Sequence, residues 1–262
     1  MRSNLEQMKM ERDTGARGLG IARVVVRLGC VGVLCLAACQ TKPPPPIVDT
    51  SALEVQAFVR QTFTHGVPYE AARRFDARVV PVLWQMLADP IEEPHWPNIA
   101  VMLAIVGEEG VADGLIEFVR ADHAEVLSPA HYAAKTAALM ALGYHVYHTG
   151  DQDCLDYLSR CADPAYWRRL DLQWRAPFPQ SPEERDTQLA TLAVLGLALS
   201  GAPEAERRLE ALRQLSRTPE GAGIGAAVGD VLDEAIEACR TIQKEGLSEY
   251  CRPTHRLDGE VP

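Results

Sequence analysis

Three alanine-rich apolar segments recur along this chain, and each closes on a glycine. They are Ala100–Gly107 (AVMLAIVG), Thr136–Gly143 (TAALMALG) and Leu189–Gly196 (LATLAVLG). A helix that is apolar on nearly all sides must be sandwiched between neighbours, and alanine lets those neighbours approach closely. The chain lacks the alternating β-branched segments and the Asn-Gly dipeptides that are typical of strands and hairpins. The pattern therefore predicts an all-α fold built from repeated helical units.

An amphipathic segment follows each of the three apolar segments. These second segments span Val111–Arg120, Asp151–Arg160 and Pro203–Leu215. Each has an apolar stripe opposite a charged face, as expected for a helix that covers one side of a stack. The alternation of sandwiched and covering helices predicts a short α-solenoid of about three to five antiparallel helix pairs. A non-repeating helical bundle whose helices merely share alanine is the alternative.

The repeat resembles HEAT-like repeats, including those of phycobilisome lyase-type bacterial proteins. Gly107 and Gly143 are 36 residues apart, whereas Gly143 and Gly196 are 53 apart, which corresponds to one repeat plus an insertion. The resemblance covers roughly residues 77–243. It implies a curved stack of helices with an extended concave surface suited to peptides and folded partners.

Hydroxyl and proline residues mark several predicted helix starts. A hydroxyl side chain at the N-cap and a proline in the first turn satisfy or remove backbone N–H groups that have no helical partner. This combination occurs at Ser128-Pro129, Ser181-Pro182 and Thr218-Pro219. A capping-box pattern also places a helix start at Ser51, and Gly246 predicts the end of the last long helix.

The N-terminal region has the organisation of an export signal. Basic residues precede an uncharged apolar stretch, Leu28–Ala38. A stretch of about eleven residues is much shorter than the roughly twenty that span a bilayer, so it predicts a secretory signal. Its end, Leu36-Ala37-Ala38-Cys39, resembles the lipobox of bacterial lipoproteins, in which the chain is cut before an acylated cysteine. An ordinary secretory signal, or an uncleaved anchor in which Cys39 is incidental, is the alternative.

The lipobox resemblance implies a location at the bacterial envelope. Cleavage would fall between Ala38 and Cys39, and two or more acyl chains would attach the protein stably to the membrane. In lipoproteins an aspartate after the cysteine often signals retention in the inner membrane. Gln40 at this position favours the outer membrane, facing the periplasm. Pro43–Pro46 favour a stiff polyproline II spacer.

The patterns divide the chain into four predicted parts, with the start codon left open between Met1, Met8 and Met10. The parts are a signal peptide at residues 1–38, a lipidated tether at 39–50, a helical repeat domain at 51–246 with an insertion at 162–184, and a tail at 247–262.

The chain is acidic, with a formal net charge of −10 from 26 Lys and Arg against 36 Asp and Glu. Residues 1–38 carry more basic than acidic groups, so loss of the signal makes the mature chain more acidic. Binding of nucleic acid requires clustered basic residues. We therefore expect no nucleic-acid partner, and expect the membrane, through acyl chains, and unidentified proteins as partners.

Four cysteines would remain in the mature chain besides the lipidated one. An even number in an oxidising compartment permits two disulfides. Cys154 and Cys161 on one unbroken helix would lie about 10 Å apart along its axis, too far to bridge. Cys239 and Cys251 flank the helix end predicted at Gly246, so a tail that folds back could pair them. Four buried free thiols are the alternative.

Two histidines near a predicted helix end are a candidate metal site. His145 and His148 are three residues apart, so they could share one face of a helix. The local candidates to complete the site are Cys154 and either Asp151 or Asp153. Because no further ligand is evident, histidines interacting with the helix dipole are the simpler interpretation, and we expect no metal.

A charged loop and a glycine-rich segment are the other candidates for chemistry. The loop Glu92–His95 could do acid–base work, or it could be a charged turn between helices. The segment Gly221–Gly229 lacks the Gly-x-Gly-x-x-Gly spacing of a phosphate loop, and its glycines more simply permit close helix packing. We therefore expect no catalytic residue and no cofactor.

The predicted insertion, residues 162–184, concentrates aromatic and basic residues among prolines. These residues are Tyr166, Trp167, Arg168, Arg169, Trp174, Arg175 and Phe178. Trp, Tyr and Arg are the residue types that anchor protein interfaces. The segment could therefore dock a protein or an anionic glycan, or its rings could instead cover apolar surface where the insertion interrupts the stack.

Together these features predict a non-enzymatic, lipid-anchored scaffold or adaptor for protein partners in the bacterial envelope. The alternative is an envelope enzyme, or an enzyme-accessory factor, that uses His145, His148 or the Glu92–His95 loop.

Overall fold

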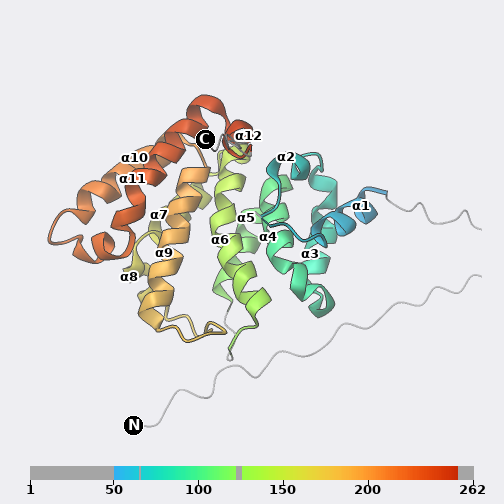
Figure 1. Cartoon of the computed structure of the whole chain (residues 1–262), viewed down its shortest axis with the longest axis horizontal. Coiled ribbons are helices and arrows are strands. Elements are labelled where there is room, and N and C mark those ends of the chain that lie inside the picture. The colour runs from blue at the N-terminus through green and yellow to red at the C-terminus, as the bar shows by residue number, and fades with distance from the viewer. Residues whose placement is uncertain (1–49, 65, 122–125, 253–262) are drawn as a thin grey trace, which may run out of the picture. The chain divides into compact units, whose positions relative to one another are not determined.

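A computed structural model describes residues 50–64, 66–121 and 126–252 (Figure 1). These residues belong to one compact unit. Apart from one isolated bridge between Val126 and Arg175, all of their regular structure is helical, which confirms the predicted all-α fold for this part of the chain. The predicted cleavage site at Ala38 and Cys39 lies outside the described residues, as does the proline spacer.

The described helices follow one another with short connections. The α-helices are α1 (Thr50–Val59), α2 (Tyr69–Ala72), α3 (Val80–Ala88), α4 (Trp96–Val106), α5 (Val111–Arg120), α6 (Pro129–Thr149), α7 (Gln152–Cys161), α8 (Pro164–Leu170), α9 (Pro182–Leu199), α10 (Pro203–Ser216), α11 (Ala222–Glu245) and α12 (Leu247–Tyr250). Two 3₁₀ helices, η1 (Ala77–Val79) and η2 (Pro90–His95), precede α3 and α4. None of the described helices is both long and apolar enough to cross a bilayer.

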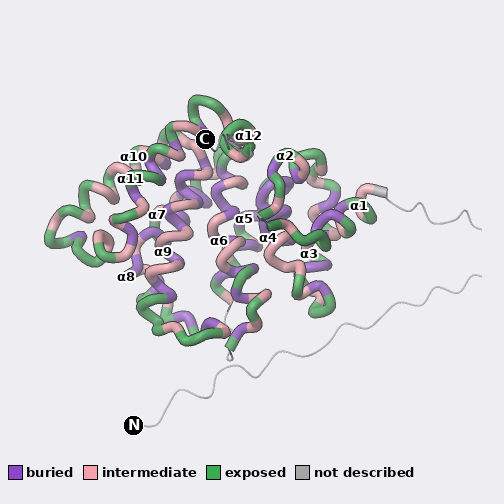
Figure 2. Tube along the Cα trace, viewed as in Figure 1, coloured by how far each residue is buried: buried purple, intermediate pink, exposed green. Residues whose placement is uncertain are grey.

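Four helices form the interior of this unit. α4 packs against α6, α6 against α9, and α9 against α11, and Figure 1 shows α4, α6 and α9 side by side. Every residue of α4 from Ile99 to Val106 is buried, as expected for a helix with neighbours on all sides. The buried residues in Figure 2 follow the same helices.

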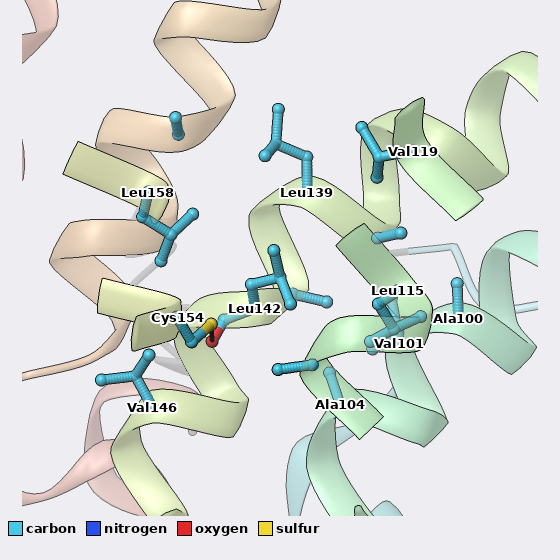
Figure 3. Packing of buried hydrophobic residues seen from close by; sticks show 14 of the residues in the cluster. Ala100, Val101, Ala104, Leu115, Val119, Leu139, Leu142, Val146, Cys154 and Leu158 are labelled. Carbon is cyan, nitrogen blue, oxygen red and sulfur yellow. Dashed lines mark hydrogen bonds between the residues drawn. The ribbon is translucent and has the colours of Figure 1, made fainter. Parts of the chain in front are cut away.

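Shorter helices cover the interior. α5 packs against α4 and α6, α7 against α6 and α9, and α10 against α9 and α11. α5 buries one stripe of residues, among them Leu115 and Val119, and exposes its charged side. Figure 3 shows Leu139 and Leu142 of α6 between the side chains of α4 and α5 and those of α7. Burying one such side chain contributes about 1.5–3 kcal/mol.

The glycines that close the three repeated segments have different roles. Gly107 ends α4, as predicted. The helix ends predicted at Gly143 and Gly196 are wrong, because both residues lie inside longer helices, α6 and α9. A Cβ atom on Gly143 would overlap the carbonyl oxygen of Gly196, so these residues mark a crossing where two helix backbones touch. α6 ends instead at Gly150, whose φ of 69° is left-handed.

Local chemistry explains most of the helix starts. The Ser128 hydroxyl accepts the His131 N–H at 3.0 Å, which confirms the predicted start of α6. Ser181 and Glu184 form a reciprocal capping box at α9, also as predicted. The helix start predicted at Thr218 is wrong, because Thr218 accepts the Gly221 N–H and closes a turn before α11.

The predicted start at Ser51 differs from the structure by a small shift. α1 already includes Thr50, so Ser51 lies within the helix rather than at its N-cap. Gly246 ends α11 with a φ of 85°, as predicted. The short helix α12 follows and packs against α11.

Candidate functional site

The aromatic and basic segment at residues 162–184 folds as a short helix and a return loop. Asp163 caps α8 by accepting the Ala165 N–H at 2.8 Å. Asp171 ends that helix in the left-handed conformation, with a φ of 48°. From there the chain runs to Ser181, the N-cap of α9, and pairs once with the loop before α6 through the bridge between Val126 and Arg175.

Both tryptophans of this segment belong to the core. Trp167 and Trp174 are fully buried. The Trp167 indole N–H donates to the carbonyl oxygen of Cys161 at 2.7 Å. Since neither ring reaches the surface, the predicted docking role is wrong for these two residues. Their rings instead cover apolar surface, which was the alternative interpretation.

Two buried cations flank the Trp174 ring. The ammonium of Lys135 lies 5.6 Å from the ring centroid, and the guanidinium of Arg185 lies 5.4 Å from it. A cation over an indole face is attracted by the ring quadrupole. Sequence reasoning missed both cations, although Lys135 stands alone within an alanine-rich helix and Arg185 lies in the first turn of α9.

Lys135 also caps the C-terminal end of α5. Its ammonium donates to the carbonyl oxygens of Phe118, Val119 and Ala121, at 2.5, 3.2 and 2.9 Å. These carbonyls lie at the negative end of the helix dipole, which favours a cation there. The three bonds compensate for the removal of a fully buried charge from water. Lys135 therefore links α5, α6 and the return loop.

Arg185 secures the return loop to α9. Its guanidinium donates to the carbonyl oxygens of Leu172 and Trp174, at 2.8 and 3.0 Å. The buried carboxylate of Asp186 accepts two further bonds from the same group. A buried charge is tolerated when it is paired and hydrogen-bonded, and both conditions are met here. The loop is thus held by α9 as well as by α6.

The remaining residues of the segment are at least partly exposed. Arg168, Arg169 and Arg175 are exposed. Phe178 is 49% exposed and packs edge-on against Tyr132, with ring centroids 5.2 Å apart. Tyr166 is half-buried against Tyr157. These five residues remain candidates for partner contact.

A hollow of about 580 Å³ lies beside α8. Ile116, Leu170 and Leu172 supply its apolar lining. The polar lining comes from α5, with Asp113 and Glu117 one turn apart and Arg120 at the end of the helix. The hollow thus carries acidic groups along one part of its wall and a guanidinium at another.

The two candidate metal-binding histidines lie on α6 but have different surroundings. His145 is fully buried, and its Nε2 atom lies 3.3 Å from the Asp151 carboxylate, outside hydrogen-bond geometry. Burial lowers the pKa of His145, and Asp151 opposes that shift. His148 Nε2 lies 3.0 Å from the Tyr69 hydroxyl and its ring stacks on the Tyr69 ring. Burial and then Arg73 lower its pKa.

The structure does not join these histidines into a ligand set. Among the described residues, no group of three or more His, Cys, Asp or Glu side chains has the arrangement that holds a metal ion. Cys154, the proposed additional ligand, has its thiol directed at the Leu142 carbonyl oxygen. Burial raises the pKa of that thiol, so the thiolate that a metal would need is disfavoured.

The carboxylates of the predicted acid–base loop have structural partners. The loop forms η2, and Glu92 accepts a bond from Arg60 Nε at 3.1 Å. That hydrogen bond is the main reason why the pKa of Glu92 is lowered. The Ser128 hydroxyl donates to Glu93. These contacts connect η2 to α1 and to the start of α6.

The predicted Cys239–Cys251 disulfide is not formed. Cys154, Cys161, Cys239 and Cys251 are all free thiols, as in the alternative interpretation. Cys239 faces the connection between α9 and α10, with its sulfur 3.8 Å from the Ala202 carbonyl oxygen. Cys251 lies beside Tyr144 of α6. The tail folds back as expected, but it brings Cys251 to α6 rather than to Cys239.

The glycines near α11 serve packing. Cβ atoms on Gly221 and Gly225 would overlap the backbone of Leu215 and Ser216, so these two glycines let α11 approach the last turn of α10. Comparison with protein-family models, curated proteins and solved structures finds no match to this chain.

Proposed function

We propose that this protein is a non-enzymatic adaptor of the bacterial envelope, held to the membrane by lipid on Cys39. The proposal treats the helices as HEAT-like pairs in a short solenoid. The successive packing of α4, α6, α9 and α11, with α5, α7 and α10 covering them, supports that arrangement and is the observation that carries the proposal. Such stacks present extended surfaces to protein partners.

The surroundings of the candidate chemical groups favour an adaptor over an enzyme. Glu92 is held by Arg60, Glu93 by Ser128 and His148 by Tyr69. Each group therefore connects helices that are distant in sequence. A general acid or base needs access to a substrate proton, and these contacts occupy the polar atoms that would provide it.

The lipid anchor rests on the sequence Leu36-Ala37-Ala38-Cys39 and on the short apolar stretch before it. Gln40 supports the outer membrane as the site of attachment. Mass spectrometry of the native product tests this directly. We expect a chain that begins at Cys39 and carries acyl groups, and a Cys39→Ser variant that is neither cut nor acylated. A native chain with an unmodified thiol, or one recovered from the cytosol, would contradict the anchor.

Cross-linking in intact cells tests the adaptor role. We expect the full chain to form specific adducts with envelope proteins, and we expect the Cys39→Ser variant to lose them because it is no longer held at the membrane surface. Adducts that are equal in amount for both forms would argue against an adaptor that works at the membrane. Metal analysis of the purified full chain provides a second check, because stoichiometric zinc that is lost on His148→Ala would favour the enzyme alternative.

A further inference from the structure

The exposed arginines of this acidic chain fall into two groups. On α10 and α11, Arg207, Arg208, Arg213 and Arg240 each form an ion pair with at least one carboxylate. Around α8, the exposed arginines form no ion pair with a described carboxylate. These are Arg120, Arg160, Arg168, Arg169 and Arg175. A guanidinium without a carboxylate partner retains its full charge for an external anion.

Three of these arginines lie on one surface beside the hollow. Arg120 lines the hollow together with Leu170, the residue that follows Arg169 on α8. Burial raises the pKa of Tyr166, and the nearby positive charges of Arg120 and Arg160 oppose that rise. Arg169 is three residues after Tyr166 on the same helix, so both lie on one helical face. Arg120, Arg160 and Arg169 therefore surround Tyr166, and we name this the arginine surface.

We propose that the arginine surface and the adjoining hollow bind an acidic, apolar peptide segment of a partner protein. Carboxylates of the peptide would meet Arg120, Arg160 and Arg169, and an apolar side chain would enter the hollow against Leu170 and its neighbours. Charge complementarity favours this occupant, because arginine binds carboxylates in a bidentate manner and is enriched at interface hot spots.

The acidic wall of the hollow determines the direction of the peptide. Asp113 and Glu117 line the hollow on α5, toward the N-terminus from Arg120. They repel carboxylates at that position, so the acidic residues of the ligand must lie on the side of Arg120 and α8. This contrast within one hollow gives directional recognition that a uniformly basic patch would not provide. The inference rests on the proposed adaptor function, whose partner class it specifies.

Fluorescence anisotropy with synthetic peptides tests the inference on the full chain in detergent. The probe is a labelled peptide that alternates glutamate and leucine, and the comparison peptides alternate glutamate and serine, or lysine and leucine. We expect saturable binding of the first peptide, weaker binding of the second and none of the third. Binding should weaken as salt is raised, because exposed charges are screened.

Charge reversal identifies the surface. Arg120→Glu with Arg169→Glu should weaken binding by at least about tenfold, and Arg120→Gln with Arg169→Gln should weaken it less. The matched control is Arg74→Glu with Arg217→Glu, which reverses two exposed arginines elsewhere on the chain and should leave binding unchanged. Thermal unfolding of each variant shows whether the fold is retained.

Several outcomes would overturn the proposal. These are absent binding of the glutamate–leucine peptide, equal loss in the control variant, and stronger binding of heparin, which would indicate an anionic glycan instead. Failure of this inference is distinct from failure of the adaptor role. In-cell adducts that survive the reversal of Arg120 and Arg169 would retain the adaptor and reject this surface, whereas an unacylated Cys39 would reject the anchor and leave the peptide assay interpretable.

Discussion

The segment from Asp163 to Ser181 has an inner side and an outer side with opposite properties. On the inner side, Trp174 is buried between Lys135 and Arg185, and every cation has a protein partner. On the outer side, Arg169 and its neighbours are exposed and lack an ion-pair partner among the described residues. Aromatic and basic residues that are mixed in the sequence are therefore separated in space, and stability and binding belong to different sides.

The largest effect should come from truncation of the inner aromatic ring. We expect Trp174→Ala to lower the free energy of unfolding by about 3–5 kcal/mol, because it removes a fully buried indole and leaves a cavity beside two cations. Urea unfolding followed by circular dichroism measures this. Arg175→Ala, at the next position but exposed, is the control and should change stability by less than about 0.5 kcal/mol.

The contact between α6 and α9 should be almost as sensitive. Gly143→Ala places a methyl group against the Gly196 carbonyl oxygen and forces the helices apart, so we expect a loss of about 1–3 kcal/mol. Gly223→Ala in α11 is the matched control, since no atom lies within 4 Å of the added methyl group. It should stabilise the helix by up to about 1 kcal/mol. Equal effects of the two changes would contradict the close crossing.

Removal of the buried ammonium tests the inner side at a second position. Lys135→Met keeps the length of the side chain but leaves the Phe118 and Ala121 carbonyl oxygens without their donor. We expect a loss of about 1–3 kcal/mol in unfolding free energy. Hydrogen exchange should show faster opening at the end of α5. A neutral result would mean that the cost of burying the charge equals the benefit of its bonds.

The buried histidines make stability depend on pH. Burial lowers the pKa values of His145 and His148 below the ordinary value of 6.5. The unfolded chain therefore binds protons first as the pH falls below about 6.5, and the folded state loses stability until the pH falls below the lowered values. Unfolding at pH values of about 7.5 and 5.5 should show this decrease. His145→Met should reduce it, and an unchanged pH dependence would contradict the burial argument.

The smallest effect on stability should occur on the outer side. Arg120→Ala with Arg169→Ala should change the free energy of unfolding by less than about 0.5 kcal/mol, because both side chains are exposed and lack an ion-pair partner among the described residues. The same variant should bind the glutamate–leucine peptide more weakly. Thermal unfolding combined with fluorescence anisotropy separates the two effects, and a large loss of stability would place these arginines on the inner side.

Local signals in the sequence were sufficient for much of the fold. The hydroxyls of Ser128 and Ser181 determine helix starts through bonds within one turn, so their roles are readable from neighbouring residues. Gly143 was misassigned because a glycine that ends a helix and one that permits a helix crossing look alike in sequence. The crossing depends on Gly196, which is 53 residues away.

The candidate site was harder to predict than the fold, because its burial depends on distant partners. Trp174 has the composition of an interface residue, but Lys135 and Arg185 approach it from other helices. The arginines of the insertion were identified from sequence, whereas Arg120 joins them only through the packing of α5 beside α8. Spacing along the chain carries no information on such contacts.

The bonds of Lys135 have a consequence for how this protein can change in evolution. Arrays of helical repeats ordinarily gain or lose units one at a time, since each unit contacts only its neighbours. Here one ammonium joins the end of α5 to α6 and to the ring of Trp174. Deletion of the segment that carries this ring would uncover a charged group in the interior, so the second and third helix pairs are inherited together or lost together.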